Sequence, residues 1–297
     1  MSRASSRASA WVQAVRPRTL TAAAAPVLVG AGLAEAHGVF ALFPVLAAFA
    51  GALLIQIATN LANDYYDFVR GADASDRVGP VRVTQAGLIP PGQVWWGMVA
   101  VLVAAASVGV YLVAVGGWPI VWIGLASLLC AVAYTGGPYP LAYHGLGDPF
   151  VFVFFGLIAV GGTYWVQGLA VPGDVLLAGV GVGALSTAIL VANNLRDLES
   201  DRSAGKRTLA VRLGRNGSRV EYAALLVVGF TVPVLGVGVY EWPAAGLIAL
   251  IAGGAAASPL ILIMTKDDPR ELIPALAGTA RVVGLYGLLL AAGLAFG

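Results

Sequence analysis

Long apolar stretches alternate with short turns and a few polar loops along the whole chain. A membrane-spanning helix needs roughly 20 mostly apolar residues, and nine stretches fit this requirement. They cover residues 20–36, 39–62, 92–115, 118–134, 149–170, 174–194, 220–240, 243–264 and 279–296. The gaps at 63–91, 195–219 and 265–278 are longer and polar. The pattern predicts an all-α membrane protein with nine transmembrane helices, forming a single domain over residues 1–297.

The basic residues predict the orientation of these helices. If the polar, amphipathic lead-in at residues 1–18 lies in the cytoplasm, all 17 Lys and Arg residues fall on the cytoplasmic side. The charged residues on the opposite side are Glu35, Asp174 and Glu241. This asymmetry follows the positive-inside rule. We therefore expect a multi-pass protein of the bacterial cytoplasmic (inner) membrane, with its N-terminus in the cytoplasm and its C-terminus outside.

Composition excludes several classes of protein. Hydrophobic residues make up 59% of the chain and charged residues 11%, against about 25% charged residues in soluble domains. One cysteine and two histidines rule out zinc and haem ligand sets. Any metal chemistry must therefore use oxygen ligands. We expect no nucleic-acid partner and no obligatory protein partner.

Polar residues mark the ends of two predicted spans. At the end of the second span they recur at i, i+3, i+4 and i+7, on one helix face: Asn60, Asn63, Asp64 and Asp67. At the end of the sixth span they recur at i, i+4 and i+8, next to Asn194: Asn193, Asp197 and Asp201. The two ends are four spans apart and so lie on the same side of the membrane. This placement predicts a pseudo-repeat of spans 1–4 and 5–8 around a central cavity.

The acidic helix ends favour a bound cation. Like charges at helical spacing repel one another, and carboxylate and amide oxygens are the ligands of Mg²⁺, which also binds substrate phosphates. Lys206 and Arg207 follow the second cluster and suit the remaining oxygens of a metal-bound diphosphate. The alternative is that the acids are solvated loop charges. Asn residues inside apolar spans count against it, because intramembrane polar residues are expensive and usually functional.

These motifs resemble a known family. Residues 63–67 (Asn-Asp-Tyr-Tyr-Asp), 194–201 (Asn-Leu-Arg-Asp-Leu-Glu-Ser-Asp) and 205–208 (Gly-Lys-Arg-Thr) are similar to the UbiA-type intramembrane aromatic prenyltransferases. Residues 11–20, 77–80, 134–138, 143–148 and 274–289 resemble one branch. That branch is the MenA-type 1,4-dihydroxy-2-naphthoate polyprenyltransferases of menaquinone biosynthesis. The resemblance extends over about residues 11–296.

The resemblance implies a fold, a cofactor and a ligand set. The fold is nine transmembrane helices around a central cavity, capped by cytoplasmic loops, and the cofactor is Mg²⁺. Carried over by position, the metal and diphosphate ligands are Asn63, Asp64, Asp67, Asp73, Asp197 and Asp201, and Lys206 contacts the diphosphate. Many relatives have a third acid in the first motif where this chain has Gly71. Asp73 and Asp76 are both candidates for this third ligand.

The implied reaction joins a polyprenyl diphosphate to an aromatic acid in the lipid bilayer, with loss of diphosphate and CO₂, and forms demethylmenaquinol. Mg²⁺ and Lys206 would stabilise the leaving diphosphate, and Asp197 or Asp201 would help deprotonate a ring hydroxyl. The apolar cavity would keep water from the allylic cation. We expect as catalytic residues Asp67, Asp197, Asp201 and Lys206. We expect as substrate-binding residues Arg16, Asn60, Asn63, Tyr134, His144, Asn193, Asn194 and Arg207.

Two of these residues have an alternative role. Arg16 lies where the first span begins, so it suits either the acceptor carboxylate, which Arg binds bidentately, or positive-inside anchoring. His144 is a lone histidine in its loop, and such residues are more often structural hydrogen-bonding groups than catalytic ones.

Two rival functions stay open from the sequence. One is a UbiA-type enzyme with another acceptor, such as 4-hydroxybenzoate, homogentisate, a haem or a sugar phosphate. The other is an ion-coupled transporter, whose polar clusters usually break helices near the middle of the bilayer. In this chain the acids stand at helix ends on one side, which favours a phosphorylated substrate over a transported ion.

Overall fold

The computed structural model describes residues 3–71, 78–79 and 82–297, and within these ranges all regular elements are helical. The first half of the bundle contains α1 (Arg3–Val15), η1 (Pro17–Thr19), α2 (Leu20–Ala36), α3 (Leu42–Val69), α4 (Pro91–Gly116) and α5 (Trp118–Ala133). The middle contains η2 (Leu141–His144), α6 (Gly147–Val151), the π-helical η3 (Phe152–Ile158), α7 (Ala159–Gly168), α8 (Gly173–Arg196) and α9 (Leu198–Ser203). The last part contains α10 (Leu209–Val239), η4 (Ala244–Ile251), α11 (Ala252–Thr265) and α12 (Pro269–Phe296).

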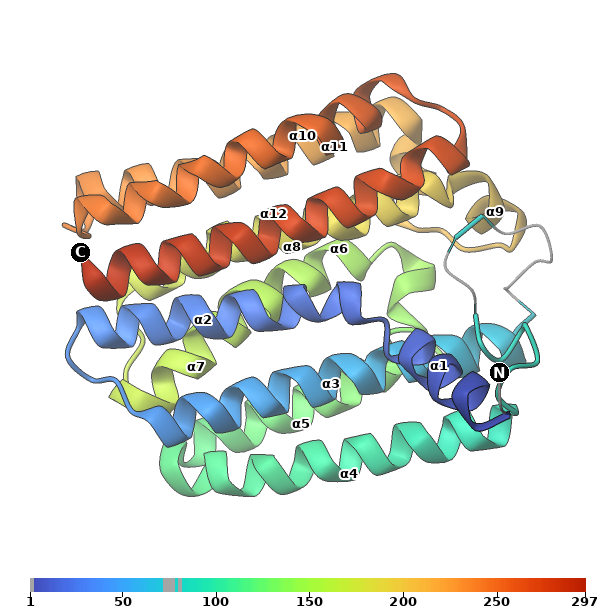
Figure 1. Cartoon of the computed structure of the whole chain (residues 1–297), viewed down its shortest axis with the longest axis horizontal. Coiled ribbons are helices and arrows are strands. Elements are labelled where there is room, and N and C mark those ends of the chain that lie inside the picture. The colour runs from blue at the N-terminus through green and yellow to red at the C-terminus, as the bar shows by residue number, and fades with distance from the viewer. Residues whose placement is uncertain (1–2, 72–77, 80–81) are drawn as a thin grey trace.

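Nine helical segments of the described chain run along the bundle: α2, α3, α4, α5, α6–η3–α7, α8, α10, η4–α11 and α12 (Figure 1). Eight stretches are long and apolar enough to cross a membrane, and α5 is a shorter apolar helix of 16 residues. Only helices and closed barrels satisfy their backbone hydrogen bonds in lipid. The chain is therefore a multi-pass integral membrane protein, and the predicted all-helical fold is confirmed.

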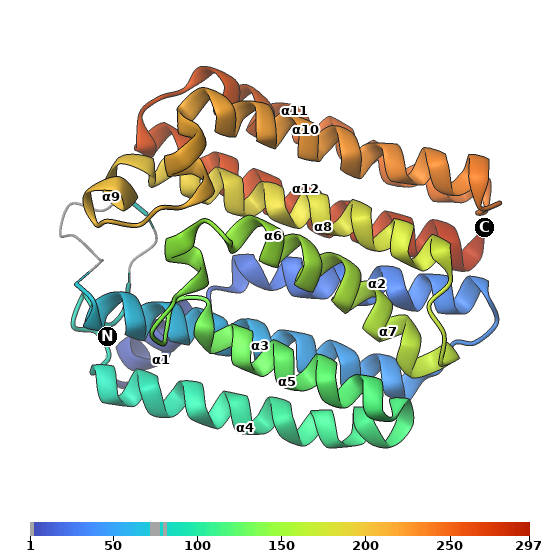
Figure 2. The ribbon, with the colours of Figure 1, turned by 180° about the vertical axis from the view of Figure 1, so that it is seen from behind.

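The connections are polar at one end of the bundle. α1, α9 and the start of α4 lie at this end, whereas the C-terminus lies at the other, as Figure 1 and the reverse view in Figure 2 both show. The same end carries the end of α3 and the end of α8, which hold the two acidic motifs. Both motifs therefore face the same side of the membrane, as their spacing of four spans predicts.

Small residues let the central helices approach closely. α8 is the most buried of the candidate spans, and it packs against η3, α10 and α12. A Cβ atom added at Gly156 of η3 would lie 2.4 Å from the Gly179 carbonyl oxygen of α8. One added at Gly32 of α2 would lie 2.6 Å from the Ala291 carbonyl oxygen of α12. Close contact through small residues replaces the hydrophobic effect as the packing force between membrane helices.

Several predicted boundaries differ from the observed helices. The lead-in at 1–18 contains a regular helix, α1, whose Trp11 and buried Ala10 and Ala14 pack with α3 and α4. The polar segment at 265–278 is mostly helix, because Pro269 begins α12 and the Asp268 carboxylate accepts a hydrogen bond from the Arg270 amide. Sequence hydropathy finds the apolar centre of a span and misses its polar ends.

The predicted pseudo-repeat stays a prediction. α3 packs extensively against α4, and α8 packs extensively against α10. These pairs are the second and third spans of the two proposed units, so the arrangement has the order that a repeat requires.

Candidate active site

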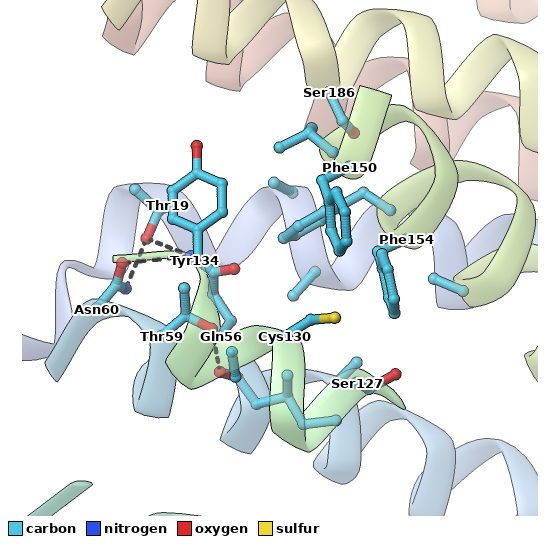
Figure 3. A pocket seen from close by; sticks show the side chains of 18 of the residues that line it. Thr19, Gln56, Thr59, Asn60, Ser127, Cys130, Tyr134, Phe150, Phe154 and Ser186 are labelled. Carbon is cyan, nitrogen blue, oxygen red and sulfur yellow. Dashed lines mark hydrogen bonds between the residues drawn. The ribbon is translucent and has the colours of Figure 1, made fainter. Parts of the chain in front are cut away.

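A cavity of about 1040 Å³ extends to the polar end of the bundle. Its apolar walls come from α3, α4, α5 and the η3–α7 segment, and its polar end carries both acidic motifs. Figure 3 shows Phe150 and Phe154 on one side of the view and the hydrogen-bonded Thr19, Gln56 and Asn60 on the other. The cavity therefore combines a charged end with a long apolar space.

Asp67, near the end of α3, is the most heavily contacted acid of the first motif. Its Oδ2 lies 2.6 Å from Arg82 Nη2, and its Oδ1 accepts a hydrogen bond of 2.8 Å from the Tyr143 hydroxyl. Lys206 Nζ lies 3.3 Å from the same Oδ1. The residue is only 2% exposed. Two cations and a hydroxyl donor therefore stabilise a buried carboxylate, as burial of a charge requires.

Asp64 lies on the same helix but does not line the cavity. Its Oδ2 accepts a hydrogen bond from the Val83 amide at 3.1 Å, and its Oδ1 accepts one from the Thr84 amide at 3.0 Å. Both carboxylate oxygens thus bind the backbone of the loop that carries Arg82. Asn63, in contrast, lines the cavity, and its Oδ1 accepts a hydrogen bond of 2.8 Å from the Thr135 hydroxyl.

The second motif has its own buried cation. Arg196 donates from Nε to Asp197 Oδ1 at 2.7 Å and from Nη2 to Asp197 Oδ2 at 2.6 Å. The same Nη2 contacts Asn193 Oδ1 at 2.9 Å. A Cβ atom on Gly79 would lie 3.3 Å from this Nη2, so the loop before Arg82 covers the guanidinium. The bidentate geometry fixes the orientation of the Asp197 carboxylate.

Lys206 connects the two motifs. Its ammonium nitrogen lies 3.3 Å from Asp67 and 3.8 Å from Asp201 Oδ1. It also lies 4.7 Å from the centre of the Tyr143 ring, a distance at which a cation and an aromatic face attract each other. The Arg207 amide donates to the Tyr143 carbonyl at 2.9 Å, which holds η2 beside the loop after α9. Elements far apart in sequence thus place one amine between two carboxylates.

The structure brings most of the expected site residues to one cavity. Those that line it are Arg16, Asn60, Asn63, Asp67, Tyr134, Asn193, Asn194, Asp197, Asp201 and Lys206. Arg207 is exposed and lies outside the lining. His144 also lies outside it, and its Nδ1 is 2.9 Å from the Pro140 carbonyl while its ring stacks on Tyr139. That geometry favours the structural role for His144. Asp73 and Asp76 lie outside the described residues.

Sequence reasoning missed three residues of this site. The sequence analysis used Arg82 only for the orientation of the chain, and it used Arg196 and Tyr143 in family-like segments without giving either a role in the site. The available signal was position: Arg196 directly precedes Asp197, two residues beyond the end of the sixth predicted span, where a carboxylate that becomes buried needs a cation as partner. Arg82 gave no comparable signal, because only the folded loop brings it to Asp67.

The profile of the UbiA prenyltransferase family matches residues 23–295. The chain belongs to this family. A 1,4-dihydroxy-2-naphthoate octaprenyltransferase of Mycobacterium tuberculosis is 40% identical over 287 residues, covering 97% of each chain. The enzyme of the same description from Escherichia coli is 36% identical over 301 residues, covering 97% of this chain and 96% of its own.

A solved structure shares the fold. The UbiA homolog from Archaeoglobus fulgidus bound to GPP and Mg²⁺ superposes with a TM-score of 0.69 at 15% identity, covering 95% of this chain and 99% of that one. At 15% identity, this similarity shows that the two proteins share the arrangement of their helices.

Proposed function

We propose that this chain transfers a polyprenyl group from its diphosphate to 1,4-dihydroxy-2-naphthoate, with loss of diphosphate and CO₂, and so forms demethylmenaquinol. The observation that carries the proposal is the full-length identity of 40% and 36% to enzymes described as 1,4-dihydroxy-2-naphthoate octaprenyltransferases. The cavity supports it, because a charged end suits the diphosphate and the apolar walls suit an isoprenoid chain.

The donor atoms at the charged end fit Mg²⁺. The cavity lining includes Asn63, Asp67, Asp197 and Asp201, and carboxylate and amide oxygens are the ligands this ion prefers. Among the described residues, no three His, Cys, Asp or Glu side chains are close enough to hold a metal ion by themselves. Diphosphate oxygens and water would complete the coordination, which is usual for Mg²⁺. When bound, Mg²⁺ would neutralise negative charge on the leaving diphosphate.

The protein's own cations assist the departure of the diphosphate. Lys206 and Arg82 both lie at the Asp67 carboxylate, close enough to the acids to turn toward phosphate oxygens. Preorganised charge of this kind acts on the charge that develops in the transition state. The apolar walls, including Phe150 and Phe154, keep water away from the allylic cation. Asp197 or Asp201 accepts the proton of a ring hydroxyl.

Arg16 is the proposed partner of the acceptor carboxylate. It lines the cavity at the junction of α1 and η1. Tyr134, Asn193 and Asn194 line the same cavity. We further propose a bacterial plasma-membrane location with the site facing the cytoplasm, since the basic loops gather at the charged end.

The test is prenyl transfer by the purified full-length protein in detergent. The protein receives a polyprenyl diphosphate and 1,4-dihydroxy-2-naphthoate, with Mg²⁺ or with EDTA. We expect a decarboxylated prenyl-naphthoquinol that forms only with Mg²⁺. Product from 4-hydroxybenzoate but not from the naphthoate would support the prenyltransferase activity and show that the proposed acceptor is wrong. No product with either acceptor, from folded protein, would overturn the proposal.

A further inference from the structure

Arg16 has an unusual backbone conformation at the cavity wall. Its φ of 53° and ψ of 70° place it in the left-handed region, which side-chain-bearing residues rarely adopt because Cβ approaches the following carbonyl oxygen. Such strained residues persist only where surrounding contacts determine them, and they cluster at functional sites.

Three polar residues supply these contacts, and we call them the Thr19 network: Thr19, Gln56 and Asn60. The carbonyl before Arg16, that of Val15, accepts a hydrogen bond of 2.8 Å from Asn60 Nδ2. The carbonyl of Arg16 itself accepts from the Thr19 amide and from the Thr19 hydroxyl, each at 2.9 Å. The peptide groups on both sides of Arg16 are therefore fixed.

The Thr19 hydroxyl is the centre of the network. Its Oγ1 accepts a hydrogen bond from Asn60 Nδ2 at 2.9 Å and from Gln56 Nε2 at 3.3 Å, as Figure 3 shows. Gln56 Nε2 also contacts Asn60 Oδ1 at 3.3 Å. Gln56 and Asn60 are 8% and 3% exposed within the membrane helix α3. Buried polar side chains in a membrane span are expensive and are usually retained for function.

The network lies within the same cavity as the acids but contacts different groups. Asn60 is one helical turn before Asn63, yet its Nδ2 donates to the Val15 carbonyl and to the Thr19 hydroxyl rather than to Asp67. Thr19, Gln56, Asn60 and Arg16 all line the cavity. The helix that carries the first acidic motif therefore also holds the backbone of Arg16.

We propose that Thr19, Gln56 and Asn60 are positioning residues that hold Arg16 in its left-handed conformation, so that its guanidinium binds the carboxylate of the aromatic acceptor. The inference rests on the proposed function, because it requires an acceptor that carries a carboxylate. The planar guanidinium binds a carboxylate bidentately only when both groups are well oriented. The network therefore determines selectivity for aromatic acids and does not affect binding of the diphosphate.

The experiment compares Thr19→Val with the wild-type protein, full length and in detergent. Valine keeps the shape of threonine and removes the hydroxyl. We expect the KM for 1,4-dihydroxy-2-naphthoate to rise about tenfold, while the KM for the polyprenyl diphosphate stays unchanged. The inhibition constant of 1,4-dihydroxynaphthalene, which lacks the carboxylate, is also expected to stay unchanged. Thr19→Ser restores the hydroxyl and is expected to recover the acceptor KM.

Thr231→Val is the matched control. Thr231 is exposed on α10 and is not among the residues that line the cavity, and its hydroxyl donates to the Val227 carbonyl of its own helix at 2.8 Å. We expect wild-type kinetics from it. Gln56→Leu provides a second break in the network if Thr19→Val does not fold. An equal loss of affinity for the acid and for 1,4-dihydroxynaphthalene would overturn the inference, and so would an unchanged acceptor KM. Failure of the wild-type protein to use any carboxylate acceptor would instead overturn the proposed function.

Discussion

Arg82 and Asp67 form an ion pair of 2.6 Å that is almost completely buried, although fourteen residues separate them in the chain and one belongs to a helix and the other to a loop. Buried charges need partners, so this pair keeps the first acidic motif stable without a ligand. A metal-bound diphosphate supplies both a cation for Asp67 and an anion for Arg82. Substrate binding is thus an exchange of partners within a preformed set of charges.

Asp67→Asn is expected to reduce kcat/KM at least about a hundredfold, the size of effect seen when one preorganised electrostatic contact to a transition state is removed. The amide keeps the size of the side chain and removes the charge that Arg82 and Lys206 neutralise. Steady-state kinetics over a range of Mg²⁺ concentrations provides the measurement. Glu199→Gln is the control, because that exposed acid pairs with the exposed Arg202 and such pairs contribute little. Wild-type activity in Asp67→Asn would show that the Asp67 carboxylate does not take part in the reaction.

Asp64→Asn separates loop anchoring from metal binding. Both Asp64 oxygens accept backbone hydrogen bonds from Val83 and Thr84, and an amide retains only one acceptor. We expect a higher KM for the polyprenyl diphosphate, because the loop that carries Arg82 loosens, with an unchanged Mg²⁺ activation curve. A shift of that curve to higher Mg²⁺ concentration would instead show that Asp64 is a metal ligand.

Helical periodicity explains why the sequence could not make this distinction. Asn63, Asp64 and Asp67 share one broad face of a helix, and periodicity gives all three the same expected role. The loop at 82–84 decides which of them faces the cavity, and no local pattern predicts where a loop folds back. The nine spans were predictable because each needs only an apolar stretch of sufficient length. Partners such as Arg82 and Tyr143 depend on contacts between distant segments, which a single sequence does not reveal.

The hydroxyl and the ring of Tyr143 make separable contacts, and the ring centre also lies 5.3 Å from the Arg70 guanidinium carbon. Its hydroxyl donates to Asp67 at 2.8 Å, and its ring lies 4.7 Å from the Lys206 ammonium. Tyr143→Phe removes only the hydrogen bond, and since bonds to charged groups contribute about 1.5–3 kcal/mol, we expect kcat/KM to fall by roughly tenfold or more. Tyr143→Leu also removes the cation–π contact, so we expect its kcat/KM to be lower than that of Tyr143→Phe. Equal activity of the two variants would contradict a role for the ring.

Asp174 is expected to matter for stability rather than for activity. At the end of the bundle opposite the acidic motifs, its Oδ2 accepts a hydrogen bond of 3.1 Å from Trp242 Nε1 and lies 3.2 Å from His37 Nε2. His37 Nδ1 in turn lies 2.7 Å from the Tyr164 hydroxyl. Asp174→Ala leaves the buried indole N–H of Trp242 without this acceptor, a loss of about 1–3 kcal/mol. The melting temperature in detergent should fall while both KM values stay unchanged, and the exposed Glu35, changed to Gln, is the control. An altered KM would link this end of the bundle to the site.

Cys130 reports directly on occupancy of the apolar space. It is the single cysteine of the chain, it is half-buried on α5, and it lines the cavity, so labelling by a maleimide marks one known position. If the prenyl chain occupies this part of the cavity, a polyprenyl diphosphate with Mg²⁺ should slow labelling several-fold, because the thiol loses access to the reagent. Inorganic diphosphate with Mg²⁺ should leave the rate unchanged, since it fills only the charged end. Mass spectrometry of the labelled protein over time gives both rates, with Cys130→Ser as the blank. Equal protection by the two ligands would mean that the site closes on diphosphate alone, and no protection by either would place the prenyl chain elsewhere.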